Sequence, residues 1–286
     1  MVHPSRGGDV ANVLWHNYFK PVLFVAVIFV WALTWSFMEY GFGIPVQALS
    51  HQPIRFLPHP KRVGILYPLL IKTHGAISVS SLYHDITLEP RENFVIAPQG
   101  PHEFALHPTR FWPDSTTIDC VIHDHQGTEQ TVLHTDDGKV LRVDLTTQTM
   151  EAYEDETLVR VMPVSTGTSP RWATPTGTFY IFRRVLDDHM QGGEPGTKDY
   201  WDVHHVPYAQ YIYRGIAIHG AWWNNHFGIP RSHGCIQLST RIHNPHPQHV
   251  IDNAKWVWDF ADLGTPVIIF GQTPQNSSTP LSYPEE

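Results

Sequence analysis

The sequence predicts a mainly β protein with one C-terminal helix, preceded by a small β-sandwich and an N-terminal transmembrane helix. Its 24 prolines and 20 glycines in 286 residues favour a turn-rich β architecture over a helical bundle. Short runs that alternate apolar and polar residues recur between turn signals along most of the chain. One long apolar run stands apart from this pattern, near the N-terminus.

That apolar run extends from Pro21 to Met38, is uncharged, and has the length that a helix needs to span a bilayer. Lys20 precedes it and Glu39 follows it, so the positive-inside rule predicts a cytoplasmic segment 1–20 and places the rest of the chain outside the cytoplasm. A cleaved signal peptide is the alternative, which the long polar lead and the lack of an A-x-A-like site disfavour. We expect a membrane-anchored protein whose main part is extracytoplasmic.

Residues 39–62 mix Pro, Gly, His and polar residues without periodicity, as a linker does. Residues 63–138 carry short alternating runs, among them Ala76–Ser80 and Asn93–Ile96, which we interpret as strands of a small β-sandwich. Cys120 shares one strand face with two isoleucines and is predicted to be a core residue.

Residues 139–271 are predicted to form a second domain, with a first strand over Val140–Leu145 and a last strand over Val267–Phe270. Apolar residues at helical spacing predict one helix near Val250–Leu263, with Gly264 placed to terminate it. The Ser-, Thr- and Pro-rich tail 272–286 is predicted to be disordered.

Charge and cysteine content exclude several classes of function. The 27 acidic and 19 basic residues give a formal net charge of −8, and no dense Lys/Arg run interrupts it, so we expect no nucleic-acid partner. The two cysteines differ in sequence context, which argues against a disulfide framework.

The candidate chemistry lies in Ile218-His219-Gly220 and Ser232-His233-Gly234-Cys235. A thiol attacks a carbonyl as thiolate, and a nearby imidazole is the usual means of generating one near neutral pH. Glycine beside the nucleophile lets a substrate approach the backbone N–H groups closely. His219 ends one alternating run and Cys235 opens another, so two adjacent strand ends would bring imidazole and thiol together.

These two motifs resemble the signature of the L,D-transpeptidase catalytic domain, the YkuD family. The resemblance continues, in the expected order, through Pro163–Gly167, Thr174–Phe179, Val206–Tyr208 and Gly264–Val267, and so covers about 140–270. The preceding region, including Phe111-Trp112-Pro113, resembles more weakly the immunoglobulin-like modules often found before this domain.

The resemblance implies a role for each residue of the motif. Cys235 would be the nucleophile and His219 the base that keeps it as thiolate, with the Gly220 carbonyl orienting the imidazole. The N–H groups of Gly234 and Cys235 would form the oxyanion hole. His233 would shape that pocket or bind substrate.

The implied reaction is acyl transfer on peptidoglycan stem peptides, which would serve as donor and acceptor. Cys235 would attack the carbonyl of the third residue, commonly a diamino acid, and the terminal D-Ala would leave. An amine of a neighbouring stem would resolve the thioester to a 3→3 cross-link. The alternatives are an L,D-carboxypeptidase, which passes the acyl group to water, and a non-catalytic wall-binding module, which the intact Cys-His pair disfavours.

Substrate contacts are predicted around the motif. Two places after the cysteine the family usually carries Asn or Arg, and here it is Gln237, which puts the substrate contact or the acceptor choice in question. The segment Asp187–Asp202 is interpreted as a mobile flap over the cleft, with a surface loop as the alternative. The predicted substrate-binding residues are Ser232, Gln237, Tyr211, Trp222 and Trp223; for the tyrosine, a place on one strand face is the alternative.

Twenty histidines raise the question of a metal. The densest groups are His204-His205, His226 and the run from His243 to His249. None has a cysteine partner at zinc-finger spacing or an H-E-x-x-H pattern. We therefore expect neither a metal nor another cofactor.

Overall fold

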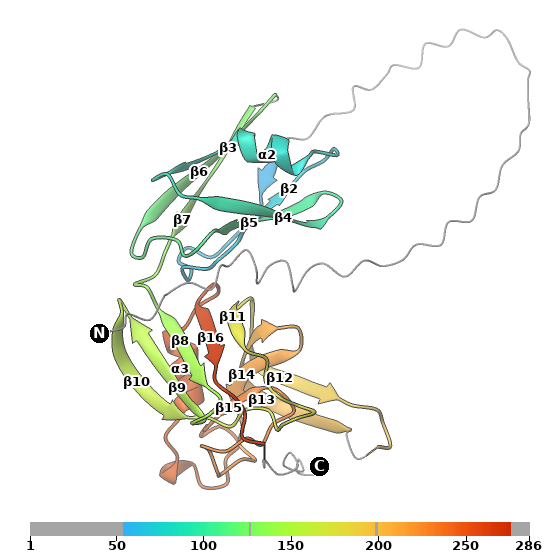
Figure 1. Cartoon of the computed structure of the whole chain (residues 1–286), viewed down its shortest axis with the longest axis vertical. Coiled ribbons are helices and arrows are strands. Elements are labelled where there is room, and N and C mark those ends of the chain that lie inside the picture. The colour runs from blue at the N-terminus through green and yellow to red at the C-terminus, as the bar shows by residue number, and fades with distance from the viewer. Residues whose placement is uncertain (1–53, 126, 198–199, 276–286) are drawn as a thin grey trace, which may run out of the picture.

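The computed structural model describes residues 54–125, 127–197 and 200–275, which form two β-rich regions (Figure 1). Among these residues, no helix has the length and apolar character that a membrane span requires. The predicted span Pro21–Met38 lies outside the described residues.

The N-terminal region has two sheets. One has the order β1-β2-β5-β4 and the other β3-β6-β7. Their bounds are β1 Arg55–Phe56, β2 Leu69–Lys72, β3 Ile86–Glu89, β4 Phe94–Gly100, β5 Glu103–Pro108, β6 Thr117–Asp124 and β7 Gly127–His134. Both sheets contribute to one apolar core, in which Cys120 is fully buried between Ile118 and Ile122, as predicted. The immunoglobulin-like resemblance of this region stays a prediction.

The prediction of a strand over Ala76–Ser80 is wrong, because this segment leads into helix α2, Val79–Asp85. Ser78 caps the helix, its hydroxyl oxygen accepting a hydrogen bond from the N–H of Ser81 at 3.0 Å. Leu82 is the one fully buried residue of the helix. An alternation of apolar and polar residues over only five positions is thus a weaker signal than the helix cap that Ser78 supplies.

The second region also has two sheets, of order β10-β9-β8-β16-β11 and β12-β13-β14-β15. The first comprises β8 Val140–Asp144, β9 Thr149–Glu154, β10 Thr157–Pro163, β11 Gly177–Tyr180 and β16 Pro266–Phe270. The second comprises β12 Arg183–Gly192, β13 Trp201–Tyr213, β14 Ile216–Gly220 and β15 Ile236–Leu238. Leu141, Met150 and Val267 of the first sheet share one core with Ile218 and Ile236 of the second. This mainly β architecture confirms the predicted fold class.

The predicted C-terminal helix is present but shorter, as α3, Asn253–Phe260, after the 3-10 turn η1, Pro247–His249. Asp252 caps it by accepting a hydrogen bond from the Lys255 N–H at 3.2 Å. Its buried face, with Ala254 and Val257, packs against β13 and β14 and so supports the strand that carries His219.

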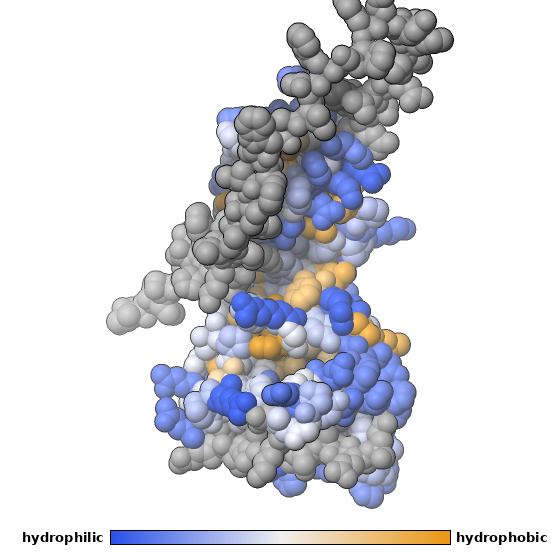
Figure 2. All heavy atoms as spheres, turned by 90° about the vertical axis from the view of Figure 1, so that its right-hand side faces the viewer, coloured by the Kyte–Doolittle hydropathy of each residue, from blue (hydrophilic) through white to orange (hydrophobic). Residues whose placement is uncertain are grey.

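The two regions meet through backbone hydrogen bonds. The N–H of Gly64 donates to the Leu263 carbonyl at 2.8 Å, and the N–H of Leu66 donates to the Gly264 carbonyl at 2.9 Å. A Cβ on Gly64 would lie 2.1 Å from the nitrogen of Thr265, so glycine is required for this approach. On the face shown in Figure 2, most of the surface is hydrophilic, and apolar side chains gather where the two regions meet.

Candidate active site

The strands β14 and β15 run parallel and adjacent, with His219 in register with Gln237. His219 is the penultimate residue of β14, and Cys235 directly precedes β15. Both side chains line one pocket of about 270 Å³, its open mouth included. The strand-end placement expected from the sequence therefore brings the imidazole and the thiol into one cavity. Six further residues line it: Met190, Trp201, Val203, Val206, Trp223 and His233.

The backbone fixes the tautomer of His219. Its Nδ1 lies 2.9 Å from the carbonyl oxygen of Gly220, which can only accept a hydrogen bond. Nδ1 therefore carries the proton, and Nε2 presents a lone pair. The ring is 3% exposed, and this burial lowers the pKa of His219 to about 4, against the opposing effects of the Gly220 carbonyl and the charge of Asp188. The imidazole is neutral at physiological pH.

Burial acts on the thiol in the opposite direction. Desolvation raises the pKa of Cys235 to about 11, and a hydrogen bond from the Ala217 backbone offsets this only in part. The Sγ atom lies 3.9 Å from the Gly215 carbonyl oxygen, to which the thiol donates weakly. The resting pair is thus a neutral thiol beside a neutral imidazole, in contrast to the thiolate that the resemblance implies.

The loop before Cys235 is held by Ser232. Its hydroxyl oxygen accepts a hydrogen bond from the Gly234 N–H at 3.1 Å and donates to the Cys235 carbonyl at 2.5 Å. Gly234 has φ +118°, a conformation that favours glycine, and Thr174 donates to its carbonyl at 2.8 Å. Because Ser232 already binds the Gly234 N–H, an oxyanion hole that uses this donor requires that hydrogen bond to open.

A second glycine brings the neighbouring loop against this one. A Cβ on Gly167 would lie 1.8 Å from the Trp172 carbonyl oxygen and 2.8 Å from the Cα of Gly234. The backbone of 165–168 is hydrogen-bonded to 231–237, with Ser232 donating to Thr166 at 3.0 Å. The position of the Cys235 loop thus depends on this close backbone approach.

The hairpin β12–β13 forms one wall of the pocket. Both ends of the segment Asp187–Asp202, predicted to be a mobile flap with a surface loop as the alternative, lie in these two strands, which pair as far as Gly192 opposite Trp201. Trp201 stacks on His233 at a centroid distance of 5.7 Å and an interplanar angle of 24°. Trp172 meets the same imidazole edge-on at 5.0 Å.

Met190 and Trp201 belong to the segment predicted to cover the cleft, but neither they nor Val203 were predicted individually as pocket residues. The alternation of Trp201 and Val203 with polar neighbours is a strand signal that could have found them.

Gln237 does not line the pocket. It is 1% exposed, and its Oε1 accepts a hydrogen bond from Nδ2 of Asn224 at 3.1 Å. The same Asn224 amide donates to Ser165 Oγ at 3.1 Å. The buried amide group of Gln237 thus connects β15 to the loops that flank the site, and its predicted substrate contact stays a prediction.

The other predicted substrate-binding residues divide between the pocket and its support. Trp223 lines the pocket, its ring 5.9 Å from that of His219. Trp222 packs edge-on against Trp223 at 5.4 Å. Tyr211 donates to Asp188 at 2.6 Å, and its ring lies 4.2 Å from the Arg183 guanidinium. Ser232 is 1% exposed, and its hydroxyl group is engaged by the Gly234 N–H and the Cys235 carbonyl.

Side chains that could ligate a metal ion gather on the hairpin β12–β13, outside the lining of the pocket. His189, Asp202 and His204 hold one potential ligand atom each within 4.8 Å of one another. The sequence did not reveal this group, because His189 comes beside the other two only through the pairing of the two strands.

Comparisons with known proteins agree with the geometry. Residues 138–269 match the sequence family of the L,D-transpeptidase catalytic domain, YkuD. A search of curated proteins by sequence found no match.

Among solved structures, an L,D-transpeptidase from Mycobacterium smegmatis is similar at a TM-score of 0.64 and 22% identity, over 77% of this chain and 100% of that one. LdtMt1 in complex with imipenem is similar at 0.63 and 21%, over 75% and 97%. L,D-transpeptidase 3 from Mycobacterium tuberculosis is similar at 0.61 and 22%, over 75% and 97%. The fold is therefore that of L,D-transpeptidases, and residues 138–269 match the family model of the L,D-transpeptidase catalytic domain.

Proposed function

We propose that this protein is a peptidoglycan L,D-transpeptidase that forms 3→3 cross-links through a thioester on Cys235. The observation that carries the proposal is the shared pocket of Cys235 and His219, in which the Gly220 carbonyl leaves the His219 Nε2 lone pair available as a base. The match of 138–269 to the catalytic-domain family supports the same chemistry.

The first half-reaction acylates the enzyme. As Sγ of Cys235 bonds to the carbonyl carbon of the third stem residue, the thiol proton passes to Nε2 of His219. The tetrahedral intermediate collapses by breaking the amide bond, and the amine of the terminal D-Ala leaves with the proton from the imidazolium. Gly220 stabilises the imidazolium because its carbonyl accepts from Nδ1–H throughout. A neutral resting pair keeps charge out of the buried pocket until substrate arrives.

The second half-reaction releases the acyl group. An amine of a neighbouring stem attacks the thioester, gives up a proton to Nε2 and forms the new amide bond, while Cys235 recovers its thiol proton. Trp201, Met190 and Val203 line the pocket with apolar surface, which favours retention of the thioester until an amine arrives over attack by water. Transfer is therefore favoured over hydrolysis.

We also propose that the predicted span 21–38 anchors the protein in the membrane, with the catalytic domain outside the cytoplasm, where peptidoglycan is cross-linked. Digestion of intact spheroplasts with a protease added to the medium tests this topology. The catalytic domain should be digested from outside, and its protection under conditions that spare a cytoplasmic marker would contradict the proposal.

Purified tetrapeptide muropeptides test the reaction itself. The wild-type chain should yield 3→3 dimers with release of D-Ala, whereas tripeptide without dimers would indicate a carboxypeptidase. Cys235→Ala should abolish both products. Cys120→Ala is the matched control, since this cysteine is fully buried in the other region and should leave the product pattern unchanged.

Because LdtMt1 was solved in complex with imipenem, we propose that carbapenems acylate Cys235 here as well. Intact-protein mass should increase by one carbapenem in the wild type and in Cys120→Ala, and stay constant in Cys235→Ala. An unchanged wild-type mass would contradict this assignment.

A further inference from the structure

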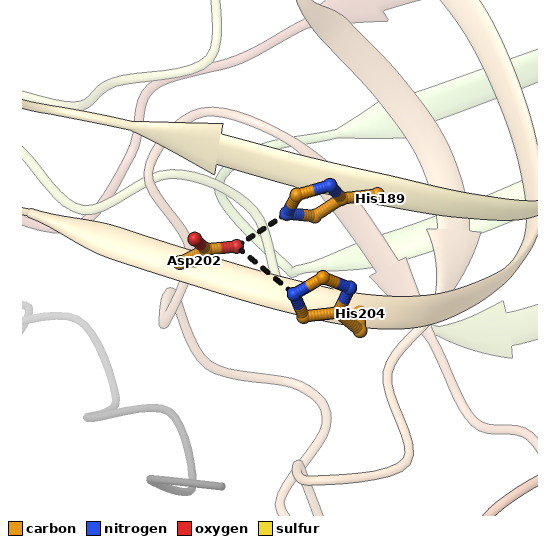
Figure 3. Close-up of side chains that lie close together, drawn as sticks. All are labelled: His189, Asp202 and His204. Carbon is orange, nitrogen blue, oxygen red and sulfur yellow. Dashed lines mark hydrogen bonds and ion pairs between the residues drawn. The ribbon is translucent and has the colours of Figure 1, made fainter.

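Three potential metal ligands converge on one face of the hairpin β12–β13 (Figure 3). Nε2 of His189 lies 2.5 Å from Oδ1 of Asp202, and Nε2 of His204 lies 3.8 Å from the same oxygen. The two imidazole rings are stacked, with centroids 3.9 Å apart and planes at 15°. Both rings thus present a nitrogen to one carboxylate oxygen.

A β-bulge produces this convergence. Asp188 pairs with Val206 and Met190 pairs with Val203, so His189 stands opposite two residues, His204 and His205. His205 is the extra residue of the bulge, and its φ is +55°. Asp202 and His204 are two positions apart on β13 and share one strand face, while Met190 and Val203 turn to the pocket on the other face.

The carboxylate of Asp202 is oriented by a further side chain. The Tyr200 hydroxyl donates to Oδ2 of Asp202 at 3.0 Å, which leaves Oδ1 directed at the two imidazoles. Hydrogen bonds of this kind to a ligating carboxylate are a regular feature of built metal sites.

We propose that His189, Asp202 and His204 bind a divalent transition-metal ion, Zn²⁺ in the first place, with water completing the coordination. Imidazole nitrogen and carboxylate oxygen are ligands that Zn²⁺ commonly takes, in sets of three protein ligands plus water. The site is distinct from the Cys235 pocket, because its ligands alternate along the two strands with Met190, Trp201 and Val203, which line that pocket.

The ligand spacing allows a tetrahedral ion with small side-chain movements. Bonds of about 2.0–2.1 Å place tetrahedral ligand atoms about 3.3 Å apart. The distance from Asp202 Oδ1 to His189 Nε2 must therefore increase from 2.5 Å, and the distance from the same oxygen to His204 Nε2 must decrease from 3.8 Å. The side chains of His189, Asp202 and His204 are 46%, 32% and 44% exposed, so both the ion and the small rotations have room.

A bound ion would join the two strands of the hairpin that forms one pocket wall. The rival reading is a metal-free cluster in which a protonated imidazole pairs with Asp202. Such an exposed pair contributes little to stability and needs only one histidine. The two readings differ in whether both histidines contribute to saturable metal binding.

Isothermal titration of the full chain with Zn²⁺ tests the proposal, with Cys235→Ala as the parent so that the reactive thiol cannot bind metal. One ion per chain should bind with a dissociation constant of about 10 µM or tighter. His189→Gln, Asp202→Asn and His204→Gln should each weaken it at least about tenfold. His243→Gln is the matched control, because this histidine lies nearby, 5.2 Å from the ring of His205, but outside the cluster.

Hydrogen exchange of the parent locates the site independently of the variants. Zn²⁺ should slow exchange in peptides covering 183–192 and 201–206, and Co²⁺ should give the visible absorption of a tetrahedral N/O site that is absent in His204→Gln. Equal affinity in parent and cluster variants, no saturable binding in the parent, or protection confined to another part of the chain would each overturn the proposal.

Discussion

Replacing Gln237 by Asn distinguishes an interior role of this amide from a substrate contact. Gln237 and Asn224 are each 1% exposed, and their side chains share a 3.1 Å hydrogen bond. Asn at 237 has one methylene fewer, so its amide would withdraw from the Asn224 Nδ2 group. Of its two acceptors, that group would then keep only the Ser165 hydroxyl.

The expected loss of stability has two parts. Removing a buried methylene costs about 1 kcal/mol. Leaving a buried N–H of Asn224 without its acceptor costs about 1–3 kcal/mol. The free energy of unfolding should therefore fall by about 2–4 kcal/mol, and the unfolding midpoint by roughly 4–16 °C. Activity per folded molecule should stay near the wild-type value, because the changed atoms lie outside the pocket lining.

Thermal unfolding by circular dichroism and dimer formation measured well below the midpoint supply the two readouts. Gln272→Asn makes the same change at an exposed position and should alter stability by less than about 0.5 kcal/mol. A double-mutant cycle with Asn224→Ala should return a coupling of about 1 kcal/mol or more. A Gln237→Asn variant that unfolds at the wild-type temperature but loses activity would refute this reasoning and restore the substrate contact.

Three further results are expected. Gly167→Ala should destabilise the catalytic domain by about 3 kcal/mol or more and abolish turnover, because its Cβ would meet the Trp172 carbonyl at 1.8 Å; dimer yield and unfolding midpoint measure this, and a near-native variant would contradict it. Desolvation raises the pKa of Cys235 to about 11, so the rate of alkylation by iodoacetamide should increase about tenfold per pH unit between pH 7 and 10. A rate that is already constant from pH 7 would instead indicate a resting thiolate. Gly64→Ala should lower the unfolding midpoint by disturbing the junction of the two regions, whereas Gly75→Ala, whose Cβ meets nothing within 4 Å, should not; equal midpoints would show that the junction tolerates the methyl group.

The sequence suffices to predict that His219 and Cys235 lie at adjacent strand ends, because each belongs to a short patterned segment. His219 ends an alternating run and Cys235 begins one, and local patterning of this kind survives into the fold as β14 and β15. Cys120 likewise takes the core position that its strand face predicts. In these cases a few neighbouring residues carry the whole signal.

Other features depend on pairings that no local pattern contains. The pocket wall of Trp201 and Met190 exists because β12 pairs with β13 through a bulge, and the same bulge places His189 beside His204. The burial of Gln237 depends on Asn224, which lies 13 positions away. Spacing along the chain predicts that a group is near the motif, but not which way its side chain points. The pKa shifts of Cys235 and His219 arise from desolvation, which is likewise a property of the assembled fold.

The central claim is that Cys235 carries the acyl group between donor and acceptor stems. Mass spectrometry of the tryptic peptide 232–241, after rapid acid quenching of enzyme mixed with a donor muropeptide and no acceptor, tests it most directly. The peptide should carry the mass of the acylated stem on Cys235 and lose it when an acceptor amine is added, as dimers form. Dimer formation without any adduct on this peptide would contradict the mechanism, and so would dimer formation by the Cys235→Ala variant.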